Sequence, residues 1–363
     1  MTPEELALFS YRTDRDMALD HEHCFLCGVF LDASNRTVEH VFAKWLQQDF
    51  NLWNQRMFLR NGTSIRYRQL TIPSCKECNE FWLAAVEDQL AHAFREGTDA
   101  VRALDQTLLC LWMAKIYYGL QFKELVLPRD RRDPGGTTIV DRAALGRQSE
   151  LHHVLQAIRR RVRFGRTPGS PRIFCSQMPA SGEEGFDYRD LQAAPFLALR
   201  IGPTVVVSSL LDWGTINRFG DPYLDLADQL DLHPAQFPEV AAHAAYRAMR
   251  FGLRFALLTV PMGGGLDLIE PVIIDAEPEP RRPAMRSFVA REFTAVFHEY
   301  TGVAFDDLYS AADDGVFSTL LTEDGRPQQI ELQEVPARVQ VVPPSFAAKY
   351  RDDPHVVSLG AIA

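Results

Sequence analysis

The sequence predicts an α+β protein, in which a short cysteine-rich segment precedes a helical stretch and a region of mixed strands and helices. Three observations support this fold class. The first 80 residues hold four of the six cysteines among many turn-forming residues. The next part of the chain, to about residue 170, has apolar residues at helical spacing. Beyond Pro171, short apolar runs rich in β-branched residues alternate with amphipathic helical patterns.

We therefore divide the chain of 363 residues into three parts, a length that allows two or three separate cores. Residues 1–97 form a cysteine-rich module, and its last part, from Asn79 to Gly97, predicts an amphipathic helix. Residues 98–170 form a helical, partly basic connecting region. Residues 171–363 form an α+β C-terminal domain, in which the glycine run of VPMGGGLD predicts a flexible hairpin.

The charge of the chain is negative overall but unevenly distributed. The formal net charge is −10, whereas residues 123–172 contain 12 Lys or Arg and 5 Asp or Glu. Electrostatic attraction is local at physiological screening lengths of about 8 Å, so this basic stretch matters for partners. No run of about 18 or more apolar residues is present, and we expect no membrane span. The N-terminus lacks a basic start followed by an apolar stretch, so we expect a cytoplasmic protein.

Four cysteines form two Cys-x-x-Cys pairs, Cys24 with Cys27 and Cys75 with Cys78. In the reducing cytoplasm, such pairs are more typical of metal ligands or redox groups than of disulfides. Two pairs that are separated by a longer loop can supply four thiolates to a tetrahedral zinc site. Gly28 follows the first pair, where the chain must turn back. We therefore predict a structural Zn²⁺ ion held by the four cysteines.

Other interpretations of the cysteines remain open. A thioredoxin-like redox protein needs only one pair, placed where a helix follows a strand. The cysteines can also be ordinary residues of the core. His21 and His23 flank the first pair and could replace a cysteine as a ligand. Tightly held zinc would exclude a freely exchangeable dithiol.

The sequence around the two pairs resembles a known family. A Glu-His dipeptide, Glu39-His40, lies in TVEHVFAKWL between the pairs, and Asn79 directly follows the second pair in IPSCKECNE. This order resembles the zinc-framed branch of the HNH endonucleases, whose ββα-metal fold carries an acidic-His dipeptide on a strand and Asn or His at a helix start. The resemblance covers about residues 22–90. It implies a metal-dependent endonuclease that hydrolyses phosphodiester bonds in nucleic acid, with DNA as the expected substrate.

The resemblance implies roles for four residues. His40 would be the general base that activates water, because an imidazole with a pKa of about 6.5 suits that role. Glu39 and Asn79 would hold a catalytic divalent cation, Mg²⁺ or Mn²⁺, through oxygen ligands. Glu87, eight residues after Asn79, is a further candidate ligand on the same predicted helix. Strand alternation would send the side chains of Glu39 and His40 to opposite faces, so we expect a local irregularity that reconciles them.

The sequence departs from the family pattern at three places. Ala43 replaces the proline expected three residues after the histidine, and the following loop lacks the usual pair of glycines. The middle asparagine, which orients the histidine in the family, is also missing, and Gln69 and Leu70 stand in its place. Gln69 is therefore the candidate to accept a hydrogen bond from the His40 ring.

Arginines supply the expected contacts with phosphate groups, because each phosphate contact adds affinity. The first group, between His40 and Cys75, consists of Arg56, Arg60, Arg66 and Arg68; the second, on a predicted helix, consists of Arg159, Arg160, Arg161 and Arg163. No base-reading motif is visible, so we expect sequence-relaxed binding. We expect the C-terminal domain to sense a regulatory ligand or a partner protein and to gate the site, which is consistent with defence against foreign DNA.

A catalytically inactive protein is the main alternative. In that interpretation the zinc-containing module is an adaptor that binds nucleic acid or another protein. Glu39 and His40 would then be a surface pair without a chemical role. The two interpretations differ in whether Glu39, His40 and Asn79 converge on one place.

Overall fold

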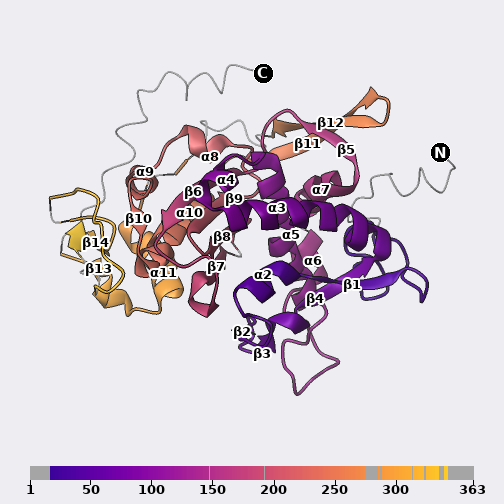
Figure 1. Cartoon of the computed structure of the whole chain (residues 1–363), viewed down its shortest axis with the longest axis horizontal. Helices are drawn as coiled ribbons and strands as arrows, with labels where there is room; N and C mark the ends of the chain where they lie inside the picture. The colour runs from indigo at the N-terminus through magenta and orange to yellow at the C-terminus, as the bar shows by residue number, and fades with distance from the viewer. Residues whose placement is uncertain are drawn as a thin grey trace.

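The computed structural model describes residues 17–146, 148–191, 193–274, 285–286, 288–312, 314–322, 324–334 and 339–341. Helices and strands are mixed within these ranges, which confirms the predicted α+β class. Figure 1 shows the N-terminal half, coloured indigo to magenta, on one side of a five-stranded sheet. Two helices, α10 (Phe237–Arg250) and α11 (Ala290–Thr301), lie on the other side.

The cysteine-rich module consists of two antiparallel strand pairs and two helices. Its elements are β1 (Arg36–His40), α2 (Lys44–Asp49), β2 (Arg56–Phe58), β3 (Ser64–Arg66), β4 (Thr71–Cys75) and α3 (Ala84–Glu96). β1 pairs with β4, so that Arg36 lies opposite Cys75 and His40 lies opposite Thr71. β2 and β3 form a separate hairpin in the connection between them. A π-helical segment (Glu77–Leu83) joins β4 to α3, so the helix predicted from Asn79 onward begins with wider turns.

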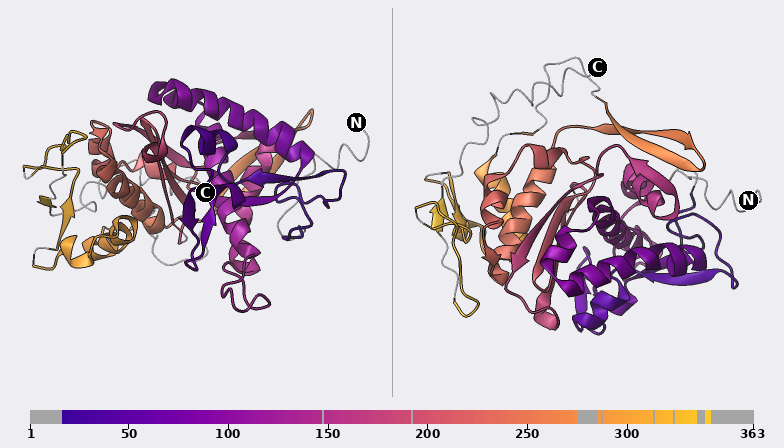
Figure 2. Two further views of the ribbon diagram at one scale, coloured as in Figure 1. Left: turned by 60° about the horizontal axis from the view of Figure 1, so that its bottom comes forward. Right: turned by 45° about the horizontal axis from the view of Figure 1, so that its top comes forward.

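The apolar stretch after residue 97 forms two helices, α4 (Thr98–Arg102) and α5 (Gln106–Leu125). The Asp105 side chain caps α5 by accepting a hydrogen bond from the Thr107 amide at 2.8 Å. α5 is buried on nearly all sides, because it packs against β4 and α3 as well as against the five-stranded sheet. Figure 2 shows it within the N-terminal half, beside the sheet. An apolar surface all round a helix is typical of such a central position.

The connecting region contains less helix than predicted. α6 (Arg142–Gly146) and α7 (Ser149–Leu155) are helical, and a short 3₁₀ turn follows and ends at Arg159. The next residues form strand β5 (Arg161–Phe164), which pairs in parallel with a strand near residue 268. The prediction that Arg159 to Arg163 lie on the surface of a helix is therefore wrong, because long-range strand pairing overrides the local helical pattern.

The partner of β5 belongs to a long hairpin of β11 (Phe255–Gly263) and β12 (Leu266–Ile273). Gly263, Gly264 and Gly265 have φ angles of +88°, +60° and +74° at its turn. Such angles favour glycine, which has no Cβ atom to clash with the backbone. The hairpin predicted from the glycine run is confirmed.

A five-stranded sheet with the order β10–β6–β9–β8–β7 organises the chain from Ser170 onward. Its strands are β6 (Ser170–Ser176), β7 (Phe186–Leu191), β8 (Phe196–Ile201), β9 (Thr204–Ser209) and β10 (Asp231–Leu232). Neighbouring strands are antiparallel, except that β10 runs parallel to β6. Both faces are buried: Leu197 and Leu199 join the hydrophobic cluster that contains α5, and Phe196 and Ala198 join the cluster that contains α10.

The remaining elements lie on the α10 side of the five-stranded sheet and at its end. They are α8 (Thr215–Arg218), α9 (Pro222–Ala227), β13 (Tyr309–Ser310), β14 (Gly315–Ser318) and β15 (Val339–Val341). The first hydrophobic cluster runs from Met17 to Ile269 and draws residues from all three predicted parts of the chain. The module, the connecting region and one face of the sheet therefore share a core. Among the described residues, no helix is long and apolar enough to cross a bilayer.

Candidate functional site

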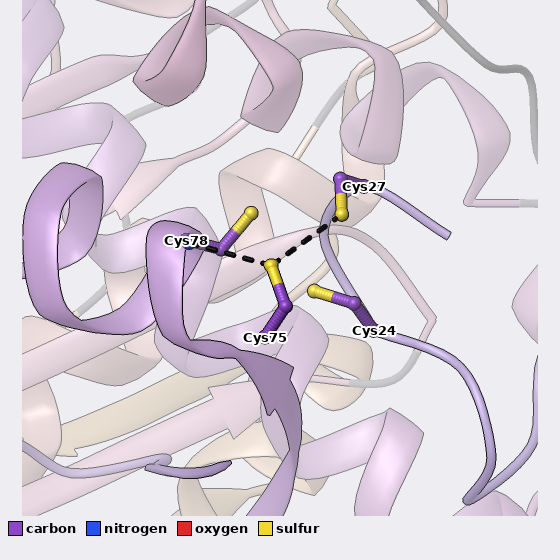
Figure 3. Close-up of side chains that lie close together, drawn as sticks. All are labelled: Cys24, Cys27, Cys75 and Cys78. Atoms are coloured by element: carbon purple, nitrogen blue, oxygen red, sulfur yellow. Dashed lines mark hydrogen bonds between the residues drawn. The ribbon is translucent and has the colours of Figure 1, made fainter. Parts of the chain in front are cut away.

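The four predicted cysteine ligands come together in the structure, as Figure 3 shows. Their sulfur atoms lie within 4.8 Å of one another and all four residues are buried. Cys27 Sγ and Cys75 Sγ are 3.7 Å apart. Thiolates held about 2.3 Å from one zinc ion at tetrahedral corners lie roughly 3.8 Å apart. The cluster could therefore bind a metal such as zinc.

Local backbone geometry prepares this cluster. Gly28 has a φ of +71°, and its amide donates to the Cys24 carbonyl at 2.9 Å, so the chain turns back directly after the first pair. On the other side, the Cys78 amide donates to Cys75 Sγ at 3.4 Å, a bond that favours a thiolate. Burial opposes ionisation of Cys24, but hydrogen bonds from the other three thiols outweigh it and lower its pKa.

The neighbouring histidines do not join the cluster. His23 directs Nδ1 to the Asp20 carboxylate at 2.8 Å. Within the described ranges, the group that could hold a metal ion contains the four cysteines, and neither His21 nor His23 belongs to it.

Glu39 and His40 occupy the last two positions of β1, and both are buried, with 4% and 8% of their surface exposed. Their side chains have different partners. The Glu39 carboxylate forms an ion pair with the Lys115 ammonium on α5. The His40 ring lies against Trp53, with ring centroids 5.6 Å apart. The expected irregularity is absent, because the register of β1 with β4 is continuous through His40, and the two side chains separate as strand alternation requires.

Lys115 lies at the centre of a buried group of oxygen atoms. Its Nζ contacts the Glu39 carboxylate and lies 2.8 Å from Glu87 Oε1. It also donates to the carbonyl oxygens of His40 at 2.6 Å and Val41 at 3.2 Å. We call this group the Lys115 centre: the side chains of Lys115, Glu39 and Glu87 with the carbonyl groups of His40 and Val41. The Lys115 side chain is only 1% exposed, so solvent ions screen its ion pairs weakly.

Opposite charges shift the pKa values of the groups in the Lys115 centre. Burial opposes the charged form of Lys115, but the charges of Glu39 and Glu87 outweigh it and raise the pKa of the lysine. Burial also raises the pKa of Glu39 to about 7; the ammonium opposes this shift and Glu87 reinforces it. Two carboxyl groups therefore share one ammonium.

α5 approaches β1 and β4 closely because residue 119 is glycine. A Cβ atom at Gly119 would lie 3.2 Å from Val41 Cγ2 and 3.3 Å from Ile72 Cδ1, tighter than most contacts of real Cβ atoms. Lys115 precedes this glycine by about one helical turn on the same face. The close approach therefore lets its ammonium reach the backbone at the end of β1.

The His40 imidazole is neutral at physiological pH. Burial, together with the charges of Lys44 and Lys115, lowers its pKa to about 4. Gln47 Nε2 lies 3.4 Å from His40 Nδ1 and also donates to the Phe42 carbonyl at 2.7 Å. Gln47 thus presents an N–H group to Nδ1, which places the ring proton on Nε2 and leaves the lone pair on Nδ1.

Two further predicted site residues have other contacts. Asn79 Nδ2 donates to Thr37 Oγ1 at 3.1 Å and to the Val38 carbonyl at 2.9 Å, which ties the π-helical segment to β1. Gln69 Oε1 accepts from the Arg66 amide at 3.3 Å and closes a short turn. Gln47 is therefore the glutamine that contacts the His40 ring.

A second, divalent cation does not fit the present arrangement of Glu39, Asn79 and Glu87. Glu39 and Glu87 do converge, as two ligands of one ion would, but the Lys115 ammonium stands between them. Asn79 directs its amide nitrogen to β1 instead. A cation at this place would have to displace a buried positive charge.

Three of the predicted phosphate-binding arginines are engaged within the protein. Arg60 forms ion pairs with Glu124 at 3.1 Å and Asp190 at 3.6 Å. Arg159 is buried, and its Nε donates to Gln156 Oε1 at 2.6 Å. Arg160 forms an ion pair with Asp267. The charges of Arg60 and Arg160 therefore serve contacts between distant segments of the fold, whereas the hydrogen bond of Arg159 to Gln156 is local.

The other five arginines are exposed or half-buried: Arg56, Arg66, Arg68, Arg161 and Arg163. Arg56 and Arg66 lie directly opposite each other in the β2–β3 hairpin. Like charges in that position repel, so an anion between them would be favourable. Arg161 and Arg163 lie on the exposed face of β5. The hairpin is therefore the stronger candidate for contact with phosphate groups.

A cavity of about 420 Å³ lies where α4 and the start of α5 meet β6, α8 and α9. Arg102 and Arg172 line it, together with Asp225 and Asp228. Arg172 already pairs with both aspartates. No site residue that we predicted from the sequence lines this cavity.

Four residues of the candidate site were not predicted from the sequence: Lys44, Gln47, Trp53 and Lys115. Lys115 had a readable signal, because it is the only charged residue in the apolar run from Leu108 to Phe122. A charge within a buried helix requires a partner of opposite charge. Gln47 and Trp53 carried no such signal, since their role depends on where α2 and the following loop meet β1.

Comparisons of this chain with protein-family models, with curated proteins and with solved structures give no match. Any assignment of function therefore depends on residues of this chain. The relevant features are the four converged cysteines, the neutral imidazole at the end of β1 and the buried lysine beside it.

Proposed function

We propose that this chain is an endonuclease of the HNH type that hydrolyses phosphodiester bonds in nucleic acid, with His40 as its general base. One observation carries the proposal. A neutral imidazole lies at the end of β1, and a helix that starts at the cysteine cluster is tied to the same strand. A metal bound by the four cysteines would join the β1–β4 strand pair to this helix and would thereby hold His40 in a fixed position.

The state of His40 suits the proposed role. A general base must be unprotonated at the working pH, and the lowered pKa of about 4 keeps the ring neutral, although it also makes the ring a weaker base than an imidazole with a pKa of about 6.5. Nδ1 would take the proton of an attacking water after the water displaces the long contact with Gln47. Trp53, which is 37% exposed and lies against the ring, offers a face on which a nucleotide base can stack.

Basic and aromatic side chains near His40 support a nucleic-acid substrate, which we propose to be DNA. Lys44 is exposed and close enough to His40 to lower its pKa. Arg56 and Arg66 oppose each other in the β2–β3 hairpin, where Phe58 is 72% exposed. Positively charged side chains attract the phosphate backbone, and exposed aromatic rings stack on bases whatever the sequence of the nucleic acid.

We assign supporting roles to the rest of the chain. The four cysteines would hold one structural zinc ion in a reducing, cytoplasmic setting, where thiols stay available as ligands. The C-terminal domain would sense a ligand or a partner protein, and the cavity beside Arg102 is a candidate binding place. Defence against foreign DNA is consistent with this arrangement by analogy with modular nucleases.

An inactive, zinc-containing adaptor is the second candidate, and the Lys115 centre is the observation that favours it. The two carboxylates that the HNH resemblance would assign to a catalytic cation surround an ammonium instead. Without that cation, the module could bind nucleic acid or another protein and leave it intact.

Cleavage of supercoiled plasmid DNA by the purified protein tests the proposal, with and without Mg²⁺ or Mn²⁺. We expect the wild type to nick the plasmid and His40→Ala to be at least about 100-fold slower, because a general base contributes roughly 10²–10⁴-fold. His92→Ala is the matched control, since His92 is exposed on α3 and pairs with Glu96. Equal nicking by His40→Ala would remove His40 from the mechanism. DNA binding without cleavage by the wild type would favour the adaptor.

Cys75→Ser tests the proposed zinc site. Structural zinc contributes roughly 10–16 kcal/mol in small metal-folded domains, so we expect the variant to lose its zinc and the module to unfold. Zinc content measured by mass spectrometry and a thermal melt are the two readouts. Cys175→Ser is the control, because Cys175 lies outside the cluster. Unchanged zinc content and melting temperature in Cys75→Ser would rule out the cysteines as the ligands.

A further inference from the structure

We infer that Lys115 is the resident cation of the site between Glu39 and Glu87, and that its ammonium excludes divalent metal ions from this site. The inference goes beyond the proposed function, because it concerns which cation the site holds, whether or not the module cleaves nucleic acid.

The oxygen atoms around Lys115 form the ligand set of a hard cation. Carboxylate oxygens come from Glu39 on β1 and Glu87 on α3, with Glu87 Oε1 at 2.8 Å. The carbonyl oxygens of His40 and Val41 add contacts of 2.6 and 3.2 Å. Carboxylates and backbone carbonyls are the groups that bind Mg²⁺, Mn²⁺ and Ca²⁺ in proteins. Here the same kind of set surrounds a nitrogen atom.

The number of oxygen groups exceeds what a simple ion pair requires. One carboxylate is sufficient to match the charge of one buried ammonium, and further carboxylates add repulsion between themselves. Lys115 has two carboxylates and two carbonyl groups as neighbours. The centre thus has the composition of an ion site in which a side chain provides the ion.

Lys115 cannot readily leave to make room for a metal ion. Its side chain is 1% exposed, and α5 is held against β1 and β4 by the close contact at Gly119. A divalent ion bound to the same two carboxylates would lie next to Nζ, and in a buried site the repulsion between the two positive charges is weakly screened. The ammonium therefore blocks the site both sterically and electrostatically.

Titration of the zinc-loaded full-length chain with Mn²⁺, with free Mn²⁺ followed by electron paramagnetic resonance, is the first test. We compare the wild type with Glu87→Gln, which removes one carboxylate of the centre. Because the ammonium already occupies the wild-type site, we expect the two titrations to coincide. A Mn²⁺ site in the wild type that Glu87→Gln abolishes would overturn the inference.

Lys115→Ala provides the second test, because it removes the ammonium and leaves the four oxygen groups. We expect this variant to bind Mn²⁺ at least about tenfold more tightly than the wild type. Its melting temperature should rise on addition of Mn²⁺, since the ion binds only the folded chain. A folded Lys115→Ala variant that gains no Mn²⁺ binding would contradict the inference. If the variant does not fold even with Mn²⁺, the comparison of the wild type with Glu87→Gln decides.

Lys123→Ala is the matched control for this second test. Lys123 lies about two turns further along α5, and its Nζ donates to the Thr71 carbonyl at 3.1 Å. Its removal takes away a half-buried ammonium of the same helix outside the Lys115 centre, so Mn²⁺ binding should not change. Neither readout measures cleavage, so a failure of this inference and a failure of the proposed nuclease activity can be told apart.

Discussion

The protein buries Glu39 on one side of its five-stranded sheet and Glu239 on the other, and the two carboxyl groups are stabilised differently. On the α5 side, Glu39 shares the Lys115 ammonium with Glu87. On the α10 side, Glu239 is 1% exposed and accepts hydrogen bonds from neutral groups. Its partners are the Ser318 hydroxyl and the amide and hydroxyl of Thr319, the last two at 2.7 and 2.6 Å.

The two arrangements have different consequences for the fold. In the Lys115 centre one ammonium is shared by two carboxyl groups from different elements, so its loss would leave the buried Glu39 and the half-buried Glu87 without a counter-charge. Around Glu239 three donors come from two consecutive residues, so the carboxylate fastens the end of β14 to α10. The first arrangement suits a site whose charge is held by a single buried ammonium group, and the second suits a structural attachment.

Of the variants that test this comparison, Lys115→Met is expected to lower the free energy of unfolding the most. Breaking a buried ion pair from one side typically costs about 3–5 kcal/mol, because the remaining charge is left without a partner. Urea denaturation at pH 7 would measure the loss in the free energy of unfolding. Lys123→Met is the control, because that ammonium donates to a carbonyl oxygen instead of joining the buried ion pairs of the Lys115 centre. A loss of less than about 1 kcal/mol would mean that the ammonium is not what neutralises Glu39 and Glu87.

A triple variant sharpens this result. Adding Glu39→Gln and Glu87→Gln to Lys115→Met removes the unmatched charges, and replacing both sides of a buried interaction is less harmful than replacing one. We therefore expect the triple variant to be more stable than Lys115→Met alone.

Glu239→Gln is expected to have a smaller effect, about 2–3 kcal/mol in the free energy of unfolding. The reason is that a hydrogen bond to a charged group contributes roughly 1.5–3 kcal/mol, and the new amide nitrogen would face donors. Glu292→Gln is the control, because Glu292 is a half-exposed residue on α11 that pairs with Arg250. Surface pairs of this kind contribute about 1 kcal/mol or less. Equal losses in the two variants would contradict a structural role for Glu239.

The difference between the two sides also explains what could be predicted from the sequence. The cysteine cluster was predictable, because each pair spans three positions and its turn is local. Lys115 was recognisable as a buried charge, but its partners Glu39 and Glu87 lie 76 and 28 positions away in the numbering. Ser318 and Thr319 lie even further from Glu239, and no local pattern links them. The same limit led Arg161 and Arg163 to be placed on a helix, whereas β5 pairs with β12 about 100 residues later.

A pH titration of stability is expected to give the smallest of the three effects, and it involves a neighbour of Glu239. His243 stacks between Tyr223 and Phe293, with ring centroids 4.0 and 4.3 Å away. Its Nε2 lies 4.0 Å from Glu239 Oε1. Burial, helped by the charge of Arg247, nevertheless lowers the pKa of His243 to about 3. The folded protein therefore keeps this histidine neutral in mildly acidic solution.

The sign of the effect follows from comparing the two states. In the unfolded chain the pKa of a histidine is about 6.5, so below that pH the unfolded state binds a proton that the folded state does not. The contribution of His243 to the free energy of unfolding is thus fully present above about pH 6.5 and is lost as the pH decreases toward about 3. Between pH 7 and pH 5 this single group should lower the free energy of unfolding by about 2 kcal/mol.

Urea denaturation of the wild type and His243→Phe at pH 7 and pH 5 measures this contribution. Phenylalanine keeps the stacking on Tyr223 and Phe293 but cannot bind a proton, so the variant should lose about 2 kcal/mol less than the wild type on acidification. His298→Gln, at an exposed position of α11, is the control and should follow the wild type. If His243→Phe and the wild type lose equal stability, the acid sensitivity lies elsewhere. The expected smaller loss in His243→Phe would identify His243 as a pH-sensitive group beside Glu239, on the α10 side of the five-stranded sheet.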